Sequence, residues 1–116
     1  MLFRVNRDLF RVMGHGARLG TQAQERQVDV AEEAAVAGLL ASGVSVIVDD
    51  TNLPPETLDT WRQIADAADA PLEVVDLRDV DVEVCIARDA DRRAKGEPDV
   101  GAEVIRAMHQ SQRRVL

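Results

Sequence analysis

Apolar positions along this chain follow two patterns, short β-branched runs and longer segments with helical spacing. The run VSVIV, bounded by a glycine and two aspartates, is typical of a strand buried on both faces of a parallel sheet. The runs LFRVN and LEVVDL predict two further strands. Between the runs, apolar residues recur every three or four positions, as on the buried face of a helix. The predicted strands are 2–6, 44–48 and 72–77, and the predicted helices are 7–13, 22–41, 55–69, 80–95 and 102–115.

Local signals place several helix ends. Thr21 and Gln24 have the spacing of a capping box at the start of the second helix. Pro55 suits the first turn of the third helix, because a proline there gives up no helical hydrogen bond. The segment 96–98, Gly-Glu-Pro, is predicted to end the fourth helix.

The helical spacing also predicts which side chains are buried. In the helix 22–41 the inward stripe is expected at Val28, Ala31, Ala35 and Leu39. In the helix 80–95 the inward residues are expected to be Val84 and Ile86, and Trp61 is expected in the core.

The order of these elements defines the fold class. Strands that alternate with helices predict an α/β fold, in which right-handed helical crossovers join the strands of a parallel sheet. We therefore expect a three-layer architecture with helices on both faces of the sheet. A length of 116 residues suits one compact domain covering residues 1–116.

Composition excludes several classes of protein. The net charge of −7 argues against a protein that coats nucleic acid, although an enzyme can hold a polynucleotide end in a local basic patch. No apolar stretch approaches the roughly 18 residues of a membrane span, so no membrane partner is expected. Cys85 is the only cysteine, which rules out an intrachain disulfide and favours a reducing compartment.

Acidic residues follow the predicted strands at 2–6 and 44–48. Asp8 comes shortly after the first, and Asp49 and Asp50 come directly after the second. Ligands of open parallel sheets bind beyond the carboxyl ends of the strands, where an aspartate can act as a general base or bind a magnesium-bound water. Aspartates are equally typical of turns and helix caps. Spacing alone therefore leaves both interpretations of these acids open.

Arg88 and Arg92 lie four residues apart on a predicted helix and so share one face. Two guanidinium groups on one face are suited to binding phosphate oxygens. The alternative is a solvated face on which the arginines pair with Asp89 and Asp91.

Four segments, in order, carry a family resemblance. VIVDDTNLPPE, followed by a helix with a tryptophan, resembles the second acidic strand of P-loop kinases of the polynucleotide kinase and zeta-toxin-like group. VNRDLFR resembles that group's N-R-D-x-x-R segment, ARDADRR its arginine-bearing lid, and EVIRAMH the helix after the lid. The likeness covers nearly the whole chain and is strongest to the 5′-kinase domain of bacteriophage polynucleotide kinase. It implies a P-loop NTPase fold and phosphoryl transfer to the 5′-hydroxyl of a nucleic acid or a related small acceptor.

The resemblance implies a role for each matching residue. Asp8 resembles the general base that takes the proton of the attacking hydroxyl, and Arg11, with Arg7 nearby, resembles the residue that binds the acceptor phosphate. Asp50, supported by Asn52, resembles the strand-end acid that organises the acceptor side or a metal-bound water. The implied substrate-binding positions are Arg7, Arg11, Asp50, Thr51 and Asn52.

The same resemblance implies that the lid acts in catalysis. Arg88 and Arg92 match the lid arginines that stabilise charge on the transferring phosphoryl group. Such a role suits a reaction whose catalysis is mostly positioning and electrostatics.

One part of the family pattern is missing. The complete family binds ATP and Mg²⁺ with a first strand and a G-x-x-x-x-G-K-[ST] loop, but the only lysine here is Lys95, and Gly-Glu follows it. The sequence therefore resembles a truncated P-loop fold without its first strand, which lies in the family between the strands matching 44–48 and 72–77. We expect those two strands to pair directly, or a second chain or second copy to complete the sheet.

Three functional interpretations remain open at this point. The chain is the larger part of a kinase whose P-loop lies upstream, or a pseudokinase that binds a nucleic-acid 5′ end or a nucleotide, or an interaction protein. In each case the chain alone is expected to be inactive as a phosphotransferase. The resemblance implies a cytoplasmic location in a bacterium or a phage-infected cell.

Overall fold

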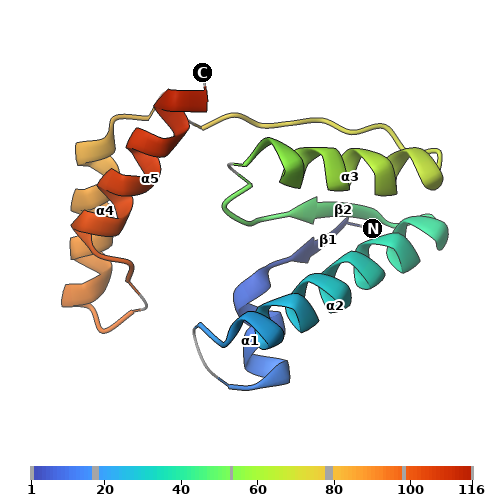
Figure 1. Cartoon of the computed structure of the whole chain (residues 1–116), viewed down its shortest axis with the longest axis horizontal. Coiled ribbons are helices and arrows are strands. Elements are labelled where there is room, and N and C mark those ends of the chain that lie inside the picture. The colour runs from blue at the N-terminus through green and yellow to red at the C-terminus, as the bar shows by residue number, and fades with distance from the viewer. Residues whose placement is uncertain (1, 17–18, 53, 78–79, 98, 116) are drawn as a thin grey trace. The chain divides into compact units, whose positions relative to one another are not determined.

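The chain forms two compact units, Met1–Glu73 and Val74–Leu116. The computed structural model describes residues 2–16, 19–52, 54–77, 80–97 and 99–115, with side chains described as far as Gln110. The first unit contains β1 (Leu2–Val5), α1 (Arg7–Gly14), α2 (Gln22–Ala41), β2 (Ser45–Val48) and α3 (Pro55–Ala67) (Figure 1). The second contains α4 (Val82–Ala94) and α5 (Ala102–Val115). Whether residues 1–116 form one domain stays a prediction.

The first unit is built on a parallel pair of strands. β1 and β2 pair in register from Leu2 opposite Ser45 to Val5 opposite Val48. The Asp49 N–H extends this ladder by donating to the Val5 carbonyl at 3.0 Å. Because the strands are parallel, the connection between them must cross back along the sheet, and α1 and α2 make that crossover. The two strands therefore end at the same edge.

The predicted helix starts at residues 7, 22, 55 and 102 are confirmed, whereas the helix predicted from residue 80 begins at Val82. Thr21 caps α2, and the Gln24 side chain accepts the Thr21 N–H at 2.8 Å, so both bonds of the capping box are present. Pro55 is the first residue of α3. The fourth helix, α4, ends at Ala94, before Gly96, as predicted; Pro98 lies outside the described residues.

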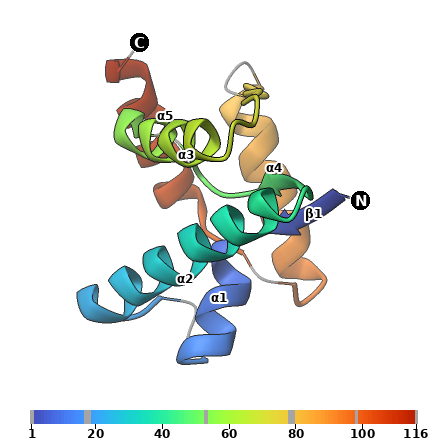
Figure 2. The ribbon, with the colours of Figure 1, turned by 90° about the vertical axis from the view of Figure 1, so that its right-hand side faces the viewer.

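The core lies on one face of the strand pair. Val5, Val36 and Trp61 are buried together, and Val46 and Val48 pack against them. Figure 2 shows α2 and α3 on the same side of the strands, in agreement with this cluster. The opposite face is open, with Ile47 46% exposed. The predictions of a strand buried on both faces and of helices on both faces are therefore not met in the described part of this unit, because both long helices cover the same face.

The predicted strand 72–77 is wrong. Residues 72–77 form no strand, and Val75 and Leu77 are 75% and 69% exposed. A strand requires a ladder partner, and this segment crosses the boundary between the two units without meeting one among the described residues. Direct pairing of 44–48 with 72–77 is therefore also wrong. Completion of the sheet by a second chain or copy stays a prediction, and β1 is the one strand neighbour that the described residues give β2.

The buried helix faces differ in part from the prediction. In α2 the buried residues are Val28, Glu32 and Val36, at four-residue spacing, whereas Ala31 is exposed. Helical spacing of apolar residues does not include a glutamate, so Glu32 was absent from the predicted stripe. In α4 the same happens, because Val84 is 41% exposed and the buried residue is Asp89.

In the second unit, Asp89 joins α4 to the start of α5. Its carboxylate is 2% exposed and accepts the backbone N–H groups of Val100 at 2.7 Å and Gly101 at 2.9 Å. These two bonds are the main reason that the pKa of Asp89 lies below its ordinary value. They satisfy N–H groups just ahead of α5, where the helix itself offers no acceptor.

We expect Asp89→Asn to loosen the second unit. An asparagine keeps one acceptor oxygen and loses the charge, so the Val100 and Gly101 N–H groups can no longer both be well satisfied. Amide hydrogen exchange of Gly101, measured by NMR, should become faster. Asp91→Asn is the matched control, because Asp91 pairs with Lys95 on the exposed surface. Equal exchange rates in the two variants would contradict this assignment.

Candidate functional site

The candidate site lies where β1 and β2 end. Asn6 follows β1 and caps α1, accepting the Asp8 N–H at 2.8 Å. Its side-chain amide donates to the Asp49 carbonyl after β2, at 3.0 Å. One asparagine therefore ties the two strand ends together and fixes where α1 begins. The short stretch between strand and helix leaves Asp8 and Arg11 on the first turns of α1, close to the sheet edge.

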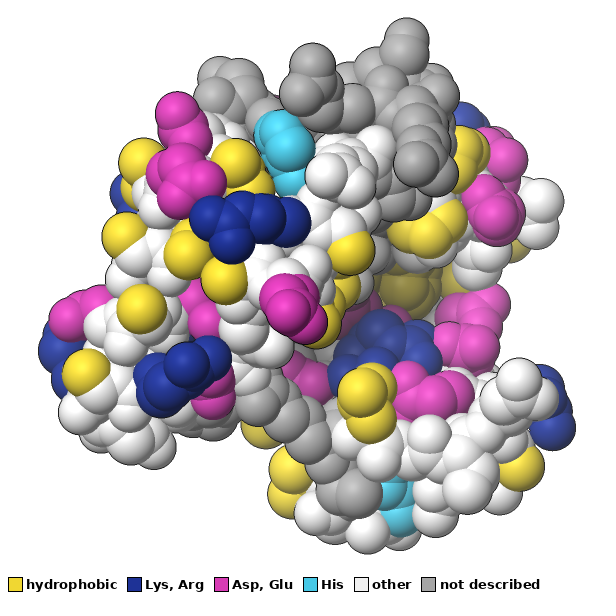
Figure 3. Space-filling view, turned by 60° about the vertical axis from the view of Figure 1, so that its left-hand side comes forward, with side chains coloured by type: hydrophobic (Ala, Val, Ile, Leu, Met, Phe, Trp, Pro, Cys, Tyr) yellow, Lys and Arg dark blue, Asp and Glu magenta, His cyan; other side chains and the backbone are white. Residues whose placement is uncertain are grey.

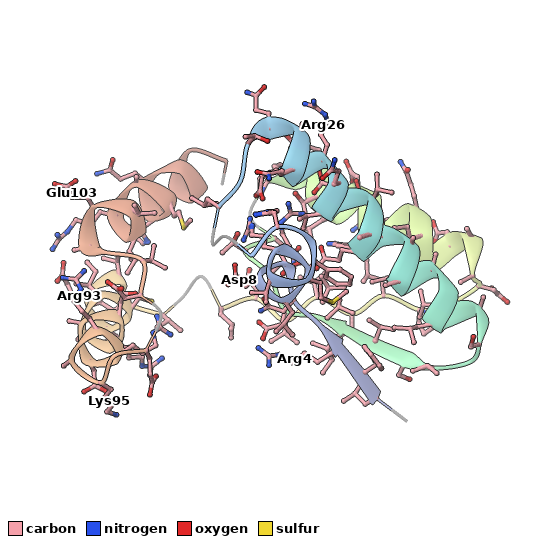
Figure 4. The ribbon with its side chains drawn as sticks, turned by 90° about the horizontal axis from the view of Figure 1, so that it is seen from below. Arg4, Asp8, Arg26, Arg93, Lys95 and Glu103 are labelled. Atoms are coloured by element: carbon pink, nitrogen blue, oxygen red, sulfur yellow. The ribbon has the colours of Figure 1, made fainter. Side chains whose placement is uncertain are left out.

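Asp8 and Arg11 form an ion pair on α1. The Arg11 guanidinium donates to Asp8 at 2.7 Å, and the Asp8 side chain is 67% exposed (Figure 4). Arg11 is itself largely buried and also binds both carboxylate oxygens of Glu25 from α2, with its closest bond at 2.6 Å. The Glu25 bond is the main cause that raises the pKa of Arg11 and lowers the pKa of Glu25. Arg11 is thus held as a permanent cation between two acids.

Arg7 is the second cation of the site. Its guanidinium pairs with Asp29 of α2, donates to the Glu25 carbonyl at 3.4 Å, and lies 3.9 Å from a Glu32 oxygen. Its backbone N–H donates to an Asp50 oxygen at 2.8 Å. One residue therefore links α1, α2 and the end of β2.

Glu32 is the site residue that sequence reasoning missed. It is 1% exposed, in the middle of α2. Burial, and after it the neighbouring Asp50 carboxyl, raises its pKa to about 8. The signal in the sequence was its position four residues after Val28 and four before Val36, on the buried stripe. An acid on such a stripe must be neutral or well paired.

The remaining residues of the β2 end make local contacts, and the substrate roles predicted for Thr51 and Asn52 stay predictions. Asp49 pairs with Arg4 on the surface at 2.7 Å, which agrees with the simple turn interpretation for that acid. The Asn52 side-chain oxygen accepts the Trp61 indole N–H at 3.0 Å and so holds the loop against α3. Thr51 is exposed. Of the predicted acceptor-side residues, Arg7, Asp8, Arg11 and Asp50 are brought together, and their predicted substrate roles stay predictions.

The two arginines are outnumbered by acids. Arg7 and Arg11 face carboxyl groups from α1, α2 and the end of β2, which are Asp8, Glu25, Asp29, Glu32 and Asp50. On the face drawn in Figure 3, basic side chains likewise lie beside acidic ones and form no continuous basic patch. A phosphate could therefore reach these arginines only by replacing one of their carboxylate partners.

Arg88 and Arg92 belong to the second unit, on α4. Both side chains are exposed, and Arg92 lies 3.4 Å from the buried Asp89. Arg92 pairs with Asp89, as one part of the alternative interpretation expects, although that acid is buried rather than solvated, and the catalytic role predicted for Arg92 stays a prediction. The assignment of both arginines to one site with Asp8 stays a prediction, because the two groups lie in different units.

The described residues do not fit the ATP and Mg²⁺ of a complete P-loop enzyme. Such a site needs a glycine-rich loop, a lysine for the phosphates and a hydroxyl for the metal. Lys95 instead ends α4 and pairs with Asp91 at 3.0 Å. Within the described ranges no three His, Cys, Asp or Glu side chains are arranged to hold a metal ion. A hollow of about 260 Å³ between α1 and α2 is lined mainly by apolar residues, among them Phe10, Met13 and Val28, and by none of the predicted site residues.

The buried acid pair predicts a pH dependence of stability. Glu32 binds its proton more tightly in the folded than in the unfolded chain, so the free energy of unfolding should fall as pH rises from about 5 to about 8. We expect a loss on the order of 1–3 kcal/mol, measured by urea unfolding across this range. Glu32→Gln should flatten the profile and Glu33→Gln should leave it unchanged. A slope that is the same in all three proteins would contradict the assignment.

Comparison with known proteins identifies the family. The family model of an AAA domain matches residues 2–115, whereas no curated protein and no solved structure matches. In the described ranges, no helix combines the length and apolarity needed to cross a bilayer. AAA domains of the P-loop class are nucleotide-binding and kinase-like in general, and they generally use ATP and Mg²⁺. The small parallel sheet and its helical crossover agree with a truncated α/β member of that class. This chain therefore belongs to the AAA domain family.

Proposed function

We propose that the first unit is the acceptor site of a polynucleotide kinase-like domain, which binds the 5′ end of a nucleic acid or a related small acceptor. One observation carries the proposal. Asp8 and Arg11 are bonded to each other at 2.7 Å beyond β1, beside Asp50 beyond the neighbouring parallel strand. An exposed acid and a fixed cation at this edge of a parallel sheet are suited to holding a hydroxyl next to a phosphate.

Each side chain has a distinct task in this proposal. Asp8 is 67% exposed and can accept the proton of an incoming 5′-hydroxyl. Arg11 keeps its charge at any physiological pH and offers a fork of N–H donors to the adjacent phosphate. Arg11 also restrains the Asp8 side chain, because its guanidinium donates a hydrogen bond to the Asp8 carboxylate. Arg88 and Arg92 are proposed to act on the transferred phosphoryl group in the complete family.

Glu25 sets a limit on affinity. It occupies the guanidinium fork of Arg11 through both carboxylate oxygens, which is where a phosphate would bind. An acceptor must displace this glutamate in a strongly acidic neighbourhood. We therefore expect weak, salt-dependent binding, with a dissociation constant of about 10⁻⁴ M or higher.

A second function has its own support. Because the described residues provide no phosphate loop, the chain can also serve as a pseudokinase or interaction module that binds a 5′ end, a nucleotide or a protein without transferring phosphate. In that case Asp8 is a surface partner of Arg11 and no proton is transferred. Binding and transfer must therefore be measured separately.

Oligonucleotide binding tests the acceptor site. A single-stranded oligonucleotide labelled at its 3′ end is titrated with the chain, and fluorescence anisotropy is recorded. Arg11→Ala should weaken binding about tenfold, because charge-assisted bonds to a phosphate are lost. Glu25→Gln should strengthen it severalfold by freeing the Arg11 fork, and Glu33→Gln is the matched control on the same helix. If Arg11→Ala binds as well as the unmodified chain, the acceptor-site proposal fails.

Phosphate transfer tests the chain as an enzyme. With Mg-ATP and a 5′-hydroxyl oligonucleotide, we expect no transfer of the γ-phosphate at an enzyme-like rate, because the phosphate anchor is absent from these residues. The measurement is the appearance of 5′-phosphorylated product. Transfer that disappears in Asp8→Asn would overturn the expectation of inactivity and would favour the full kinase interpretation.

A further inference from the structure

The buried carboxyl group of Glu32 on α2 meets the half-buried carboxyl group of Asp50 at the end of β2. The Asp50 carboxyl lies close enough to Glu32 to raise the pKa of Glu32, as a second cause after burial. Each acid has a buried oxygen, Oε2 of Glu32 and Oδ2 of Asp50, for which the described residues offer no N–H or O–H donor. Two ionised carboxylates cannot donate to each other, so this contact requires a proton on one of them.

The surroundings decide which acid carries the proton. Asp50 accepts the Arg7 backbone N–H at 2.8 Å, at the positive end of α1, so one of its oxygens already serves as an acceptor. Glu32 is 1% exposed, and burial favours its neutral form. The other charges that face Glu32 are the Arg7 guanidinium, 3.9 Å away, and Asp29 one turn earlier on α2. Glu32 is therefore the donor and Asp50 the acceptor.

The bond continues into the proposed acceptor site. Asp50 receives the proton of Glu32 on one oxygen and the N–H of the first residue of α1 on the other. The helix so anchored carries Asp8 and Arg11. We propose that neutral Glu32 is a positioning residue, which holds Asp50 against the first turn of α1 and thereby fixes the place of Asp8 and Arg11. The link to substrate rests on the proposed function.

The inference gives the site a proton-dependent geometry. When Glu32 ionises, two adjacent negative charges repel each other and Asp50 is no longer held on the first turn. The hydrogen bond to the Arg7 N–H should then weaken or move. The expected transition lies near pH 8, where Glu32 loses its proton. A glutamine at position 32 keeps a donor for Asp50 at every pH, so it should preserve the arrangement.

The test follows the backbone amide of Arg7 by ¹H–¹⁵N NMR from about pH 6 to about pH 9. The unmodified chain should show an inflection near pH 8, Glu32→Gln should give a flat profile at the neutral-form position, and Glu32→Ala should be displaced throughout. Glu33→Gln, on the same helix, should behave as the unmodified chain. If Glu32→Ala does not fold, the flat profile of Glu32→Gln decides.

Two outcomes overturn the proposal. One is an Arg7 amide without an inflection in the unmodified chain, and the other is an inflection that persists in Glu32→Gln. Oligonucleotide affinity is measured on the same samples, and it should fall above about pH 8 in the unmodified chain and hold in Glu32→Gln. If no sample binds oligonucleotide, the acceptor-site proposal fails, while the Arg7 amide still decides whether Glu32 positions α1.

Discussion

The arrangement of the first unit depends on how charge is accommodated where two parallel strands end. Arg7 lies at the centre of this arrangement. Its backbone N–H donates to the Asp50 carboxylate, and its guanidinium group lies among acidic side chains of α2. Removing Arg7 from this place would leave Glu32 and Asp50 facing each other with no nearby cation. Buried charges are tolerated only when they are paired or neutralised, and here both solutions are used side by side. This constraint links α1 to α2 and to the end of β2, and so helps to place the candidate site residues of the first unit.

The same constraint shapes what the site can bind. Both arginines that could hold a phosphate are already engaged by carboxylates, and Arg11 is engaged at both of its donor edges. Binding of an anion is therefore an exchange of partners, with little net gain in charge pairing. Under the proposed function, such a site would favour a ligand that also supplies another contact, for example a hydroxyl next to Asp8. A bare anion would gain less, because it meets the surplus of acids without that second contact.

The sheet is small for an α/β unit, and few side chains are buried against it. Two four-residue strands offer one covered face, and α2 and α3 both pack on it. The second unit is organised differently, because a single buried aspartate joins α4 to the start of α5. In both units an acid, Glu32 or Asp89, lies on the buried face of a helix. Hydrogen bonds and ion pairs of buried acids therefore help to hold the helices in place, as apolar packing does in proteins with a larger core.

The sequence by itself determined the helices, the parallel strands at the chain start and at VSVIV, the cap at Thr21, the helix start at Pro55, and the family. These features depend on neighbours within one or two turns, which the order of residues specifies directly. It also indicated that Asp8, Arg11 and Asp50 would approach one another, because parallel strands end at one edge. Only the tertiary structure decided that LEVVDL meets no strand partner among the described residues, that the described helices of the first unit leave one face of the strand pair uncovered, and that Glu32 and Asp89 are buried. Those outcomes depend on residues distant along the chain, since a ladder needs a second strand and an acid is buried only where distant donors or a shared proton compensate it.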